Sequence, residues 1–140
     1  MKIESILLVD DDEVTNFYNE YLINKMDICN TLHIAENGQI ALDKITGQNG
    51  QEMIKRPIII FLDINMPVMN GFEFLEAYTK LGDITKGDMV VCMLTTSLHE
   101  QDLKMANNFS EIAGYLNKPL GEKDITRIVD SYFEKNESNK

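Results

Sequence analysis

The stretch Pro57-Ile58-Ile59-Ile60-Phe61-Leu62-Asp63 decides the fold of this 140-residue chain. Its middle is apolar without a break and rich in β-branched isoleucine, which favours extended backbone. A strand that is apolar on both faces must be covered on both faces, as in a parallel sheet packed between two layers of helices. Proline fits the start of such a strand because it lacks the N–H that the sheet would use, and the acid ends the apolar run. The stretch therefore predicts a central strand of a parallel sheet.

Strand-like and helix-like patterns alternate on both sides of this stretch. The other short apolar runs are Ile6–Val9, Thr31–Ala35, Met89–Leu94 and Ala113–Leu116. Apolar residues recur at helical spacing within Val14–Leu22, Ala41–Ile45, Phe72–Tyr78, Leu98–Phe109 and Ile125–Phe133. This strict order of strand and helix predicts an α/β fold, a doubly wound sheet of five parallel strands flanked by five helices.

The length and the charge of the chain limit its function. It holds 13 Lys and Arg against 23 Asp and Glu, a formal net charge of −10. Binding to nucleic acid or to an anionic membrane surface needs clustered cations, so this balance argues against both partners. The length fits one domain, which we expect to span residues 1–135, followed by a polar tail at residues 136–140.

The cysteines and the N-terminal residues indicate a reducing compartment. Cys29 and Cys92 lie far apart and in no C-x-x-C spacing, as expected for reduced thiols. The first apolar run is too short for a signal peptide or a membrane-spanning helix. We therefore expect a cytoplasmic protein.

Polar residues follow four of the predicted strands at the point where each strand ends. Asp10 and Asp11 follow the first strand, Asp63 the third, Thr95 the fourth and Lys118 the fifth. Ligands of open α/β sheets bind outside the carboxyl ends of the strands, so we expect these side chains to share one edge. Carboxylates that meet there repel one another and favour a bound cation. With no His or Cys ligand set nearby, the oxygen donors suit Mg²⁺, with Mn²⁺ as a possible substitute.

Such a site has a definite chemistry. A lone aspartate beside a divalent cation and an ammonium group can attack phosphorus and form an aspartyl phosphate. The cation and the ammonium would neutralise the phosphoryl oxygens as charge develops.

Four segments, in this order and at this spacing, resemble the response-regulator receiver domains of two-component signalling. They are Leu7–Asp12, Phe61–Gly71, Leu94–Ser97 and Gly114–Pro119. The resemblance covers residues 3–133 and implies a flavodoxin-like (CheY-like) strand order of 2-1-3-4-5. The chain departs from the commonest pattern in a longer segment between Ile45 and Pro57, and in an extra residue before Lys118.

The resemblance implies a role for each residue of the acidic site. Asp63 corresponds to the phosphoacceptor, and Asp10 and Asp11 to the acidic pair that holds Mg²⁺ together with Asp63. Asn65 corresponds to the residue whose backbone carbonyl also binds the metal, and Lys118 to the lysine that contacts the phosphoryl group.

The resemblance also implies a switch. Thr95 corresponds to the switch hydroxyl and Tyr115 to the switch aromatic residue, although Thr96 is the alternative for the hydroxyl. Thr95 is preferred because it directly follows the apolar strand. The bond between Lys118 and Pro119 is cis in this family, and a proline bond tolerates that isomer.

The function implied is that of a single-domain response regulator. It would accept a phosphoryl group from a sensor histidine kinase or a phosphotransfer protein, without being an enzyme that turns over a substrate. Phosphorylation would change protein binding, or a possible homodimer, through the face of the fourth helix, the fifth strand and the fifth helix. Alternatives within the family are a phosphorelay intermediate, which passes the group onward, and a pseudo-receiver that only binds a partner. After residue 133 too few residues remain for a DNA-binding or catalytic output domain, so we expect a downstream protein target.

Two other classes of protein share parts of the pattern. Phosphatases with an aspartate nucleophile carry D-x-D, whereas this chain has Asp63-Ile64-Asn65, and an amide cannot act as the general acid. Flavodoxin-like cofactor binders need a phosphate-binding loop after the first strand. Here acids follow that strand and would repel a flavin phosphate. Asp12, the third of these acids, is expected to cap the helix that begins there.

Overall fold

The computed structural model describes residues 2–82, 88–96, 100–109 and 112–138. The strands are β1 (Ile3–Val9), β2 (Cys29–Ala35), β3 (Ile58–Asp63), β4 (Met89–Thr95) and β5 (Ile112–Asn117). The helices are α1 (Glu13–Met26), α2 (Gly38–Thr46), α3 (Gly71–Thr79), α5 (Glu100–Ala106) and α6 (Glu122–Ser138). All strands pair in parallel in the order β2-β1-β3-β4-β5, so the predicted fold class and strand order are confirmed.

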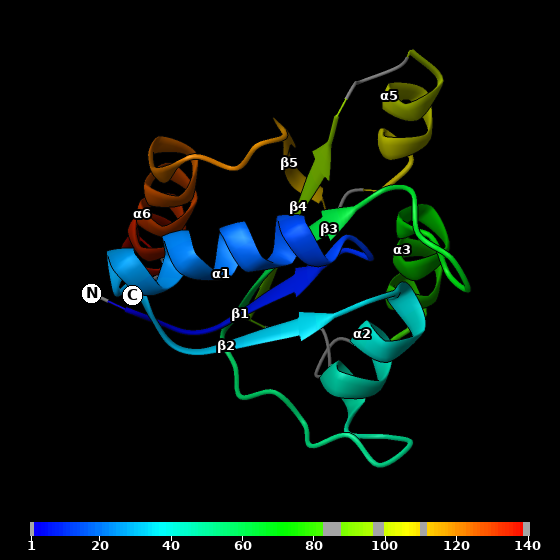
Figure 1. Ribbon diagram of the computed structural model, residues 1–140, viewed down its shortest axis with the longest axis horizontal. Helices are drawn as coiled ribbons and strands as arrows, with labels where there is room; N and C mark the ends of the chain where they lie inside the picture. The colour runs from blue at the N-terminus through cyan, green and yellow to red at the C-terminus, as the bar shows by residue number, and fades with distance from the viewer. Residues whose placement is uncertain (1, 83–87, 97–99, 110–111, 139–140) are drawn as a thin grey trace.

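The central strand β3 is buried along its whole length, as its apolar run predicts. Its residues alternate between the two faces of the sheet, so Ile60 belongs to one core cluster and Phe61 to the other. The first cluster takes residues from α2, α3 and α5, and the second takes residues from α1 and α6. Figure 1 shows α1 and α6 on one side of the sheet and α2 and α3 on the other. No helix among the described residues has the length and apolarity needed to cross a membrane.

The helix predicted over Leu98–Phe109 is shorter in the structure. Leu98 lies outside the described residues, and α5 ends at Ala106. Met105, one of the apolar residues at this helical spacing, is 47% exposed and so does not lie on a buried face. Phe109 follows the helix and stacks on Phe72, with 6.4 Å between the ring centroids. An aromatic residue at helical spacing can pack on the core without belonging to the helix.

The first helix is capped as its sequence predicts. A carboxylate oxygen of Asp12 accepts a hydrogen bond from the backbone N–H of Val14 at 3.2 Å, and the other accepts one from the Thr15 hydroxyl at 2.7 Å. These bonds also hold the pKa of Asp12 below its ordinary value, with the Thr15 bond as the largest cause. Asp12 thus serves the helix and leaves the two preceding acids for other contacts.

The apolar stripe of α1 faces solvent, although its spacing correctly predicts a helix. The buried side chains of the helix are Asn16, Asn19, Leu22 and Ile23. The exposed members of the stripe are Val14 and Phe17 at 75%, Tyr21 at 63% and Tyr18 at 45%. Periodicity locates a helix, but it does not decide which face meets the sheet.

Candidate functional site

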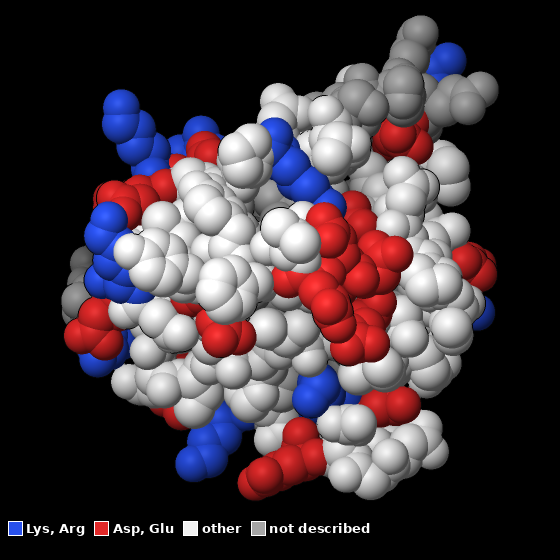
Figure 2. All heavy atoms as spheres, in the orientation of Figure 1, with Lys and Arg blue, Asp and Glu red and all other residues white. Residues whose placement is uncertain are grey.

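The structure brings the polar ends of four strands to one edge of the sheet. Asp10 follows β1, Asp63 ends β3, Thr95 ends β4 and Lys118 follows β5. In Figure 2 the acids gather in one red patch on this side of the molecule, and a blue basic side chain reaches its margin. This edge is the one that strand order and parallel pairing predict for a ligand site.

Three carboxylates form the centre of the site. Oxygens of Asp10, Asp11 and Asp63 lie within 4.8 Å of one another. Asp10 is 3% exposed and Asp63 is 8% exposed, whereas Asp11 is exposed. Burial raises the pKa of Asp63 above its ordinary value, and the negative charge of Asp10 raises it further, although Lys118 partly opposes this. Hard oxygen donors without His or Cys fit Mg²⁺, so the donor set suits the metal that its sequence predicts.

Lys118 bridges two of these carboxylates. Its Nζ lies 2.6 Å from Oδ2 of Asp10 and 3.2 Å from Oδ1 of Asp63. Burial alone would lower the pKa of Lys118, but the hydrogen bond and charge of Asp10, with those of Asp63, raise it above its ordinary value. The ammonium is therefore charged at neutral pH. One cation against three carboxylates leaves the site with a negative charge that a divalent ion would neutralise.

Asp10 is held by hydrogen bonds from several elements. Its backbone N–H donates to the carbonyl of Ala35 on β2 at 3.0 Å, and its Oδ1 accepts from the N–H of Asp12 at 2.9 Å. Its own carbonyl accepts a bond of 2.8 Å from the side-chain amide of Asn16 on α1. Sequence reasoning missed Asn16. In the sequence Asn16 lies outside the apolar stripe of α1, so the pattern gives no sign that its side chain is buried.

Gly71 is required by a close approach of two backbone segments. A Cβ atom built there would lie 2.5 Å from the carbonyl oxygen of Asp63 and 3.0 Å from the Cα of Ile64. The Gly71 N–H also donates to the carbonyl of Ile64 at 2.8 Å. The backbone of Gly71 has no positive φ, so glycine is needed there for space and not for an unusual turn conformation. The loop that follows Asp63 is closed tightly against it.

The same loop contains Asn65 and a strained valine. Asn65 is exposed two residues after Asp63, and the predicted role of its carbonyl stays a prediction. Val68 has a φ of 66° and is 80% exposed, an uncommon conformation for a β-branched residue. The Met69 carbonyl accepts the Gly38 N–H at 3.0 Å, which fastens the loop to α2.

The candidate switch residues lie at the ends of β4 and β5. Thr95 is 4% exposed and Thr96 is exposed, and the Thr95 carbonyl accepts the Lys118 N–H at 2.8 Å. Tyr115 is partly buried against the core cluster on the α3 side of the sheet. The peptide bond between Lys118 and Pro119 is cis, as expected.

Comparison with known proteins agrees with this geometry. The chain is 31% identical over 124 residues to the response regulator Rcp1 of Synechocystis sp., covering 89% of this chain and 82% of that protein. It is 34% identical over 104 residues to a protein-glutamate methylesterase/protein-glutamine glutaminase of Desulfotalea psychrophila, which covers 74% of this chain and 26% of that protein. The chain thus spans about a quarter of that enzyme's length.

A solved response-regulator structure has the same fold as this chain. A two-component response regulator from Cytophaga hutchinsonii superposes with a TM-score of 0.83 at 28% identity, covering 96% of this chain and 99% of that one. Residues 6–130 match the sequence profile described as the response regulator receiver domain. With its acidic edge, its bridging lysine and this match over most of its length, the chain belongs to the response regulator receiver domain family.

Proposed function

We propose that this receiver domain accepts a phosphoryl group on Asp63 from a phosphohistidine of a sensor histidine kinase or a phosphotransfer protein. The observation that carries the proposal is the placement of Lys118 between Asp10 and Asp63, beside a carboxylate trio within 4.8 Å. A pseudo-receiver has no need to hold three like charges at one edge against their repulsion.

Each residue of the site has a separate role in the proposed phosphoryl transfer. A carboxylate oxygen of Asp63 attacks phosphorus, the new P–O bond forms, and the P–N bond breaks with its electron pair returning to the imidazole. Lys118 is placed to neutralise a phosphoryl oxygen on Asp63, because its Nζ is already 3.2 Å from that carboxylate. Asp10, Asp11, Asp63 and the carbonyl of Asn65 would hold Mg²⁺, and the ion would supply further charge neutralisation at the phosphoryl oxygens.

We infer that the donor protein docks on the exposed stripe of α1, defined by Val14, Phe17, Tyr18 and Tyr21. A phosphohistidine that reaches Asp63 must approach the edge of the sheet where α1 begins, so a donor covers the start of this helix. Figure 2 shows that uncharged surface continues from the acidic patch over α1. The donor surface that fits combines apolar side chains, for the stripe, with basic side chains, for the neighbouring acids.

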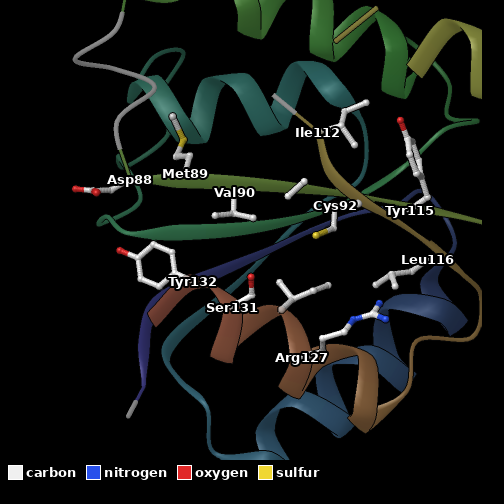
Figure 3. Close-up of a pocket in the computed structure, with 13 residues that line it drawn as sticks. Asp88, Met89, Val90, Cys92, Ile112, Tyr115, Leu116, Arg127, Ser131 and Tyr132 are labelled. Carbon is white, nitrogen blue, oxygen red and sulfur yellow. The ribbon is translucent and has the colours of Figure 1, made fainter. Parts of the chain in front are cut away.

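The proposed output uses the face made by α5, β5 and α6. The phosphorylated Asp63 would attract the hydroxyl of Thr95, and Tyr115 would pack inward behind it. A hollow of about 690 Å³ lies beside β4, β5 and α6, and Cys92, Tyr115 and Ser131 are among the residues that line it (Figure 3). Whether the signal ends in protein binding or in passing the phosphoryl group onward is decided by the partner, and both agree with this site.

The proposal is tested by incubating the protein with Mg²⁺ and a small phosphodonor, followed by mass spectrometry. The expected product is one phosphoryl adduct on Asp63, stable in acid and labile in alkali. Asp63→Asn, which keeps the side-chain shape, is the matched control and should remain unmodified. A folded wild-type protein without any adduct would overturn the proposal and would favour a pseudo-receiver.

A further inference from the structure

The inner face of α1 carries two buried asparagines that a helix packed on a sheet does not need. Asn16 is 5% exposed and Asn19 is 2% exposed. The Oδ1 atoms of both side chains are buried without a hydrogen-bond partner among the described residues. A buried polar atom without a partner costs stability, so an apolar residue would suit packing better at either position.

Asn16 differs from Asn19 in one contact. Its Nδ2 donates a buried hydrogen bond of 2.8 Å to the backbone carbonyl of Asp10. That carbonyl lies just beyond the end of β1, where the sheet ladder no longer supplies a partner. The bond joins α1 directly to the turn that carries Asp10 and Asp11.

Carboxylate repulsion acts on this turn. Asp10, Asp11 and Asp63 hold carboxylate oxygens within 4.8 Å of one another, and the single ammonium of Lys118, 2.6 Å from Asp10 and 3.2 Å from Asp63, does not neutralise all three. Like charges at that separation push the turn outward toward water. If the Asn16 amide were removed, outward movement of the turn would also let the Asp10 carbonyl accept a hydrogen bond from water. The Asn16 bond opposes both tendencies.

We propose that Asn16 is a positioning residue that keeps the Asp10–Asp11 turn in its cation-binding arrangement before the cation arrives. The proposal rests on the proposed function, since it concerns the same acidic site. A turn held in place has less rearrangement to make when it binds a cation, and affinity rises accordingly. The amide of Asn16 makes this bond although its own oxygen is buried without a partner among the described residues.

The test compares Asn16→Leu with Asn19→Leu. Leucine has the same number of side-chain heavy atoms and the same branching as asparagine, so each change removes the amide and adds the same extra volume at both positions. Titration with Mn²⁺, followed by the electron paramagnetic resonance of the free ion, gives the dissociation constant of each folded protein. Loss of the bond is expected to weaken binding about 5- to 30-fold in Asn16→Leu. Asn19→Leu is expected to bind Mn²⁺ as the wild type does.

A metal-free signal separates positioning from general loosening. The N–H of Asp12 donates to Oδ1 of Asp10 at 2.9 Å, so its NMR chemical shift reports the closed turn. That signal is expected to move in Asn16→Leu and to stay in Asn19→Leu. Asn16→Ala is a second variant, since alanine suits a helix and also lacks the donor.

The results of these measurements distinguish the positioning role of Asn16 from the proposed function of the site. Wild-type affinity in the Asn16 variants would overturn the positioning role and leave the proposed function standing. An equal loss in Asn16→Leu and Asn19→Leu would also overturn it, because it would indicate loosening of the whole helix. A wild-type protein that binds no Mn²⁺ would overturn the cation site itself and this inference with it.

Discussion

The ammonium of Lys118 lies closer to Asp10 than to Asp63, at 2.6 Å against 3.2 Å. Asp10 is the more buried carboxylate, so it gains most from the paired charge. Asp63 therefore remains incompletely compensated, which agrees with its raised pKa. The residue proposed to react is the one that the protein leaves with a poorly neutralised charge.

Replacing Asp63 by Asn is expected to stabilise the metal-free protein at pH 7. Because burial and the Asp10 charge raise its pKa, the folded protein binds more protons at Asp63 than the unfolded chain does. Stability contributed by this group is thus lost as the pH rises from its ordinary value of 3.8 through the raised value. Thermal unfolding should show a higher Tm for Asp63→Asn at pH 7, with a gap that narrows toward pH 4 and on addition of Mg²⁺. A lower Tm for the variant at pH 7 would contradict the assigned repulsion.

Replacing Gly71 by Ala is expected to destabilise the protein by about 1–3 kcal/mol, the usual cost of forcing extra atoms into a packed site. The new Cβ would meet the carbonyl oxygen of Asp63 at 2.5 Å, and that backbone would have to move. Urea unfolding measures the free-energy change, and phosphorylation by a small donor should slow as well. Gly121→Ala is the control, because its Cβ would meet only the Asp124 side chain at an ordinary 3.7 Å. Equal stability of the two variants would refute the close approach.

Replacing Phe17 or Tyr21 by Ala is expected to change the free energy of unfolding by no more than about 0.5 kcal/mol, because both side chains are largely exposed. If the stripe on α1 binds the donor, transfer from a phosphohistidine protein should fall at least about 10-fold, as for an aromatic residue central to an interface. Phosphorylation by a small donor should stay unchanged. Met53→Ala removes a 54% exposed apolar side chain that follows α2 and is the control. Unaltered protein-to-protein transfer in both variants would place docking elsewhere.

Replacing Thr95 by Ala is expected to leave phosphorylation of Asp63 largely intact and to uncouple it from the output face. The reason is that the buried hydroxyl at the end of β4 is proposed to follow the phosphoryl group, not to bind it for reaction. NMR shift changes in β5 and α6 on phosphorylation should shrink in Thr95→Ala and persist in Thr95→Ser, which keeps the hydroxyl. Equal loss of phosphorylation and of the shift changes in Thr95→Ala would argue against this division of roles.

Most of the fold could be predicted from the chain because its central strands β1, β3 and β4 are largely buried on both faces. Burial on both faces leaves an unbroken apolar run, as in Ile58–Leu62, and that signal is local in sequence. Strand ends were predicted less well, since β5 begins at Ile112 and pairs irregularly near Val91. The buried face of α1 was not predicted, because asparagines lie against the sheet and most of the apolar stripe faces solvent.

The sequence by itself determined the alternating α/β order, the strand ends that carry Asp10, Asp63, Thr95 and Lys118, and the cap at Asp12. Each depends on residues close together in the chain, through periodicity, strand ends or capping. Only the tertiary structure decided that Lys118 pairs first with Asp10, 108 positions away, and that Asn16 holds the carbonyl of Asp10. It also decided that Gly71 makes room for Asp63. These are relations of distance and burial between separate elements, and such relations exist only once the strands and helices have packed.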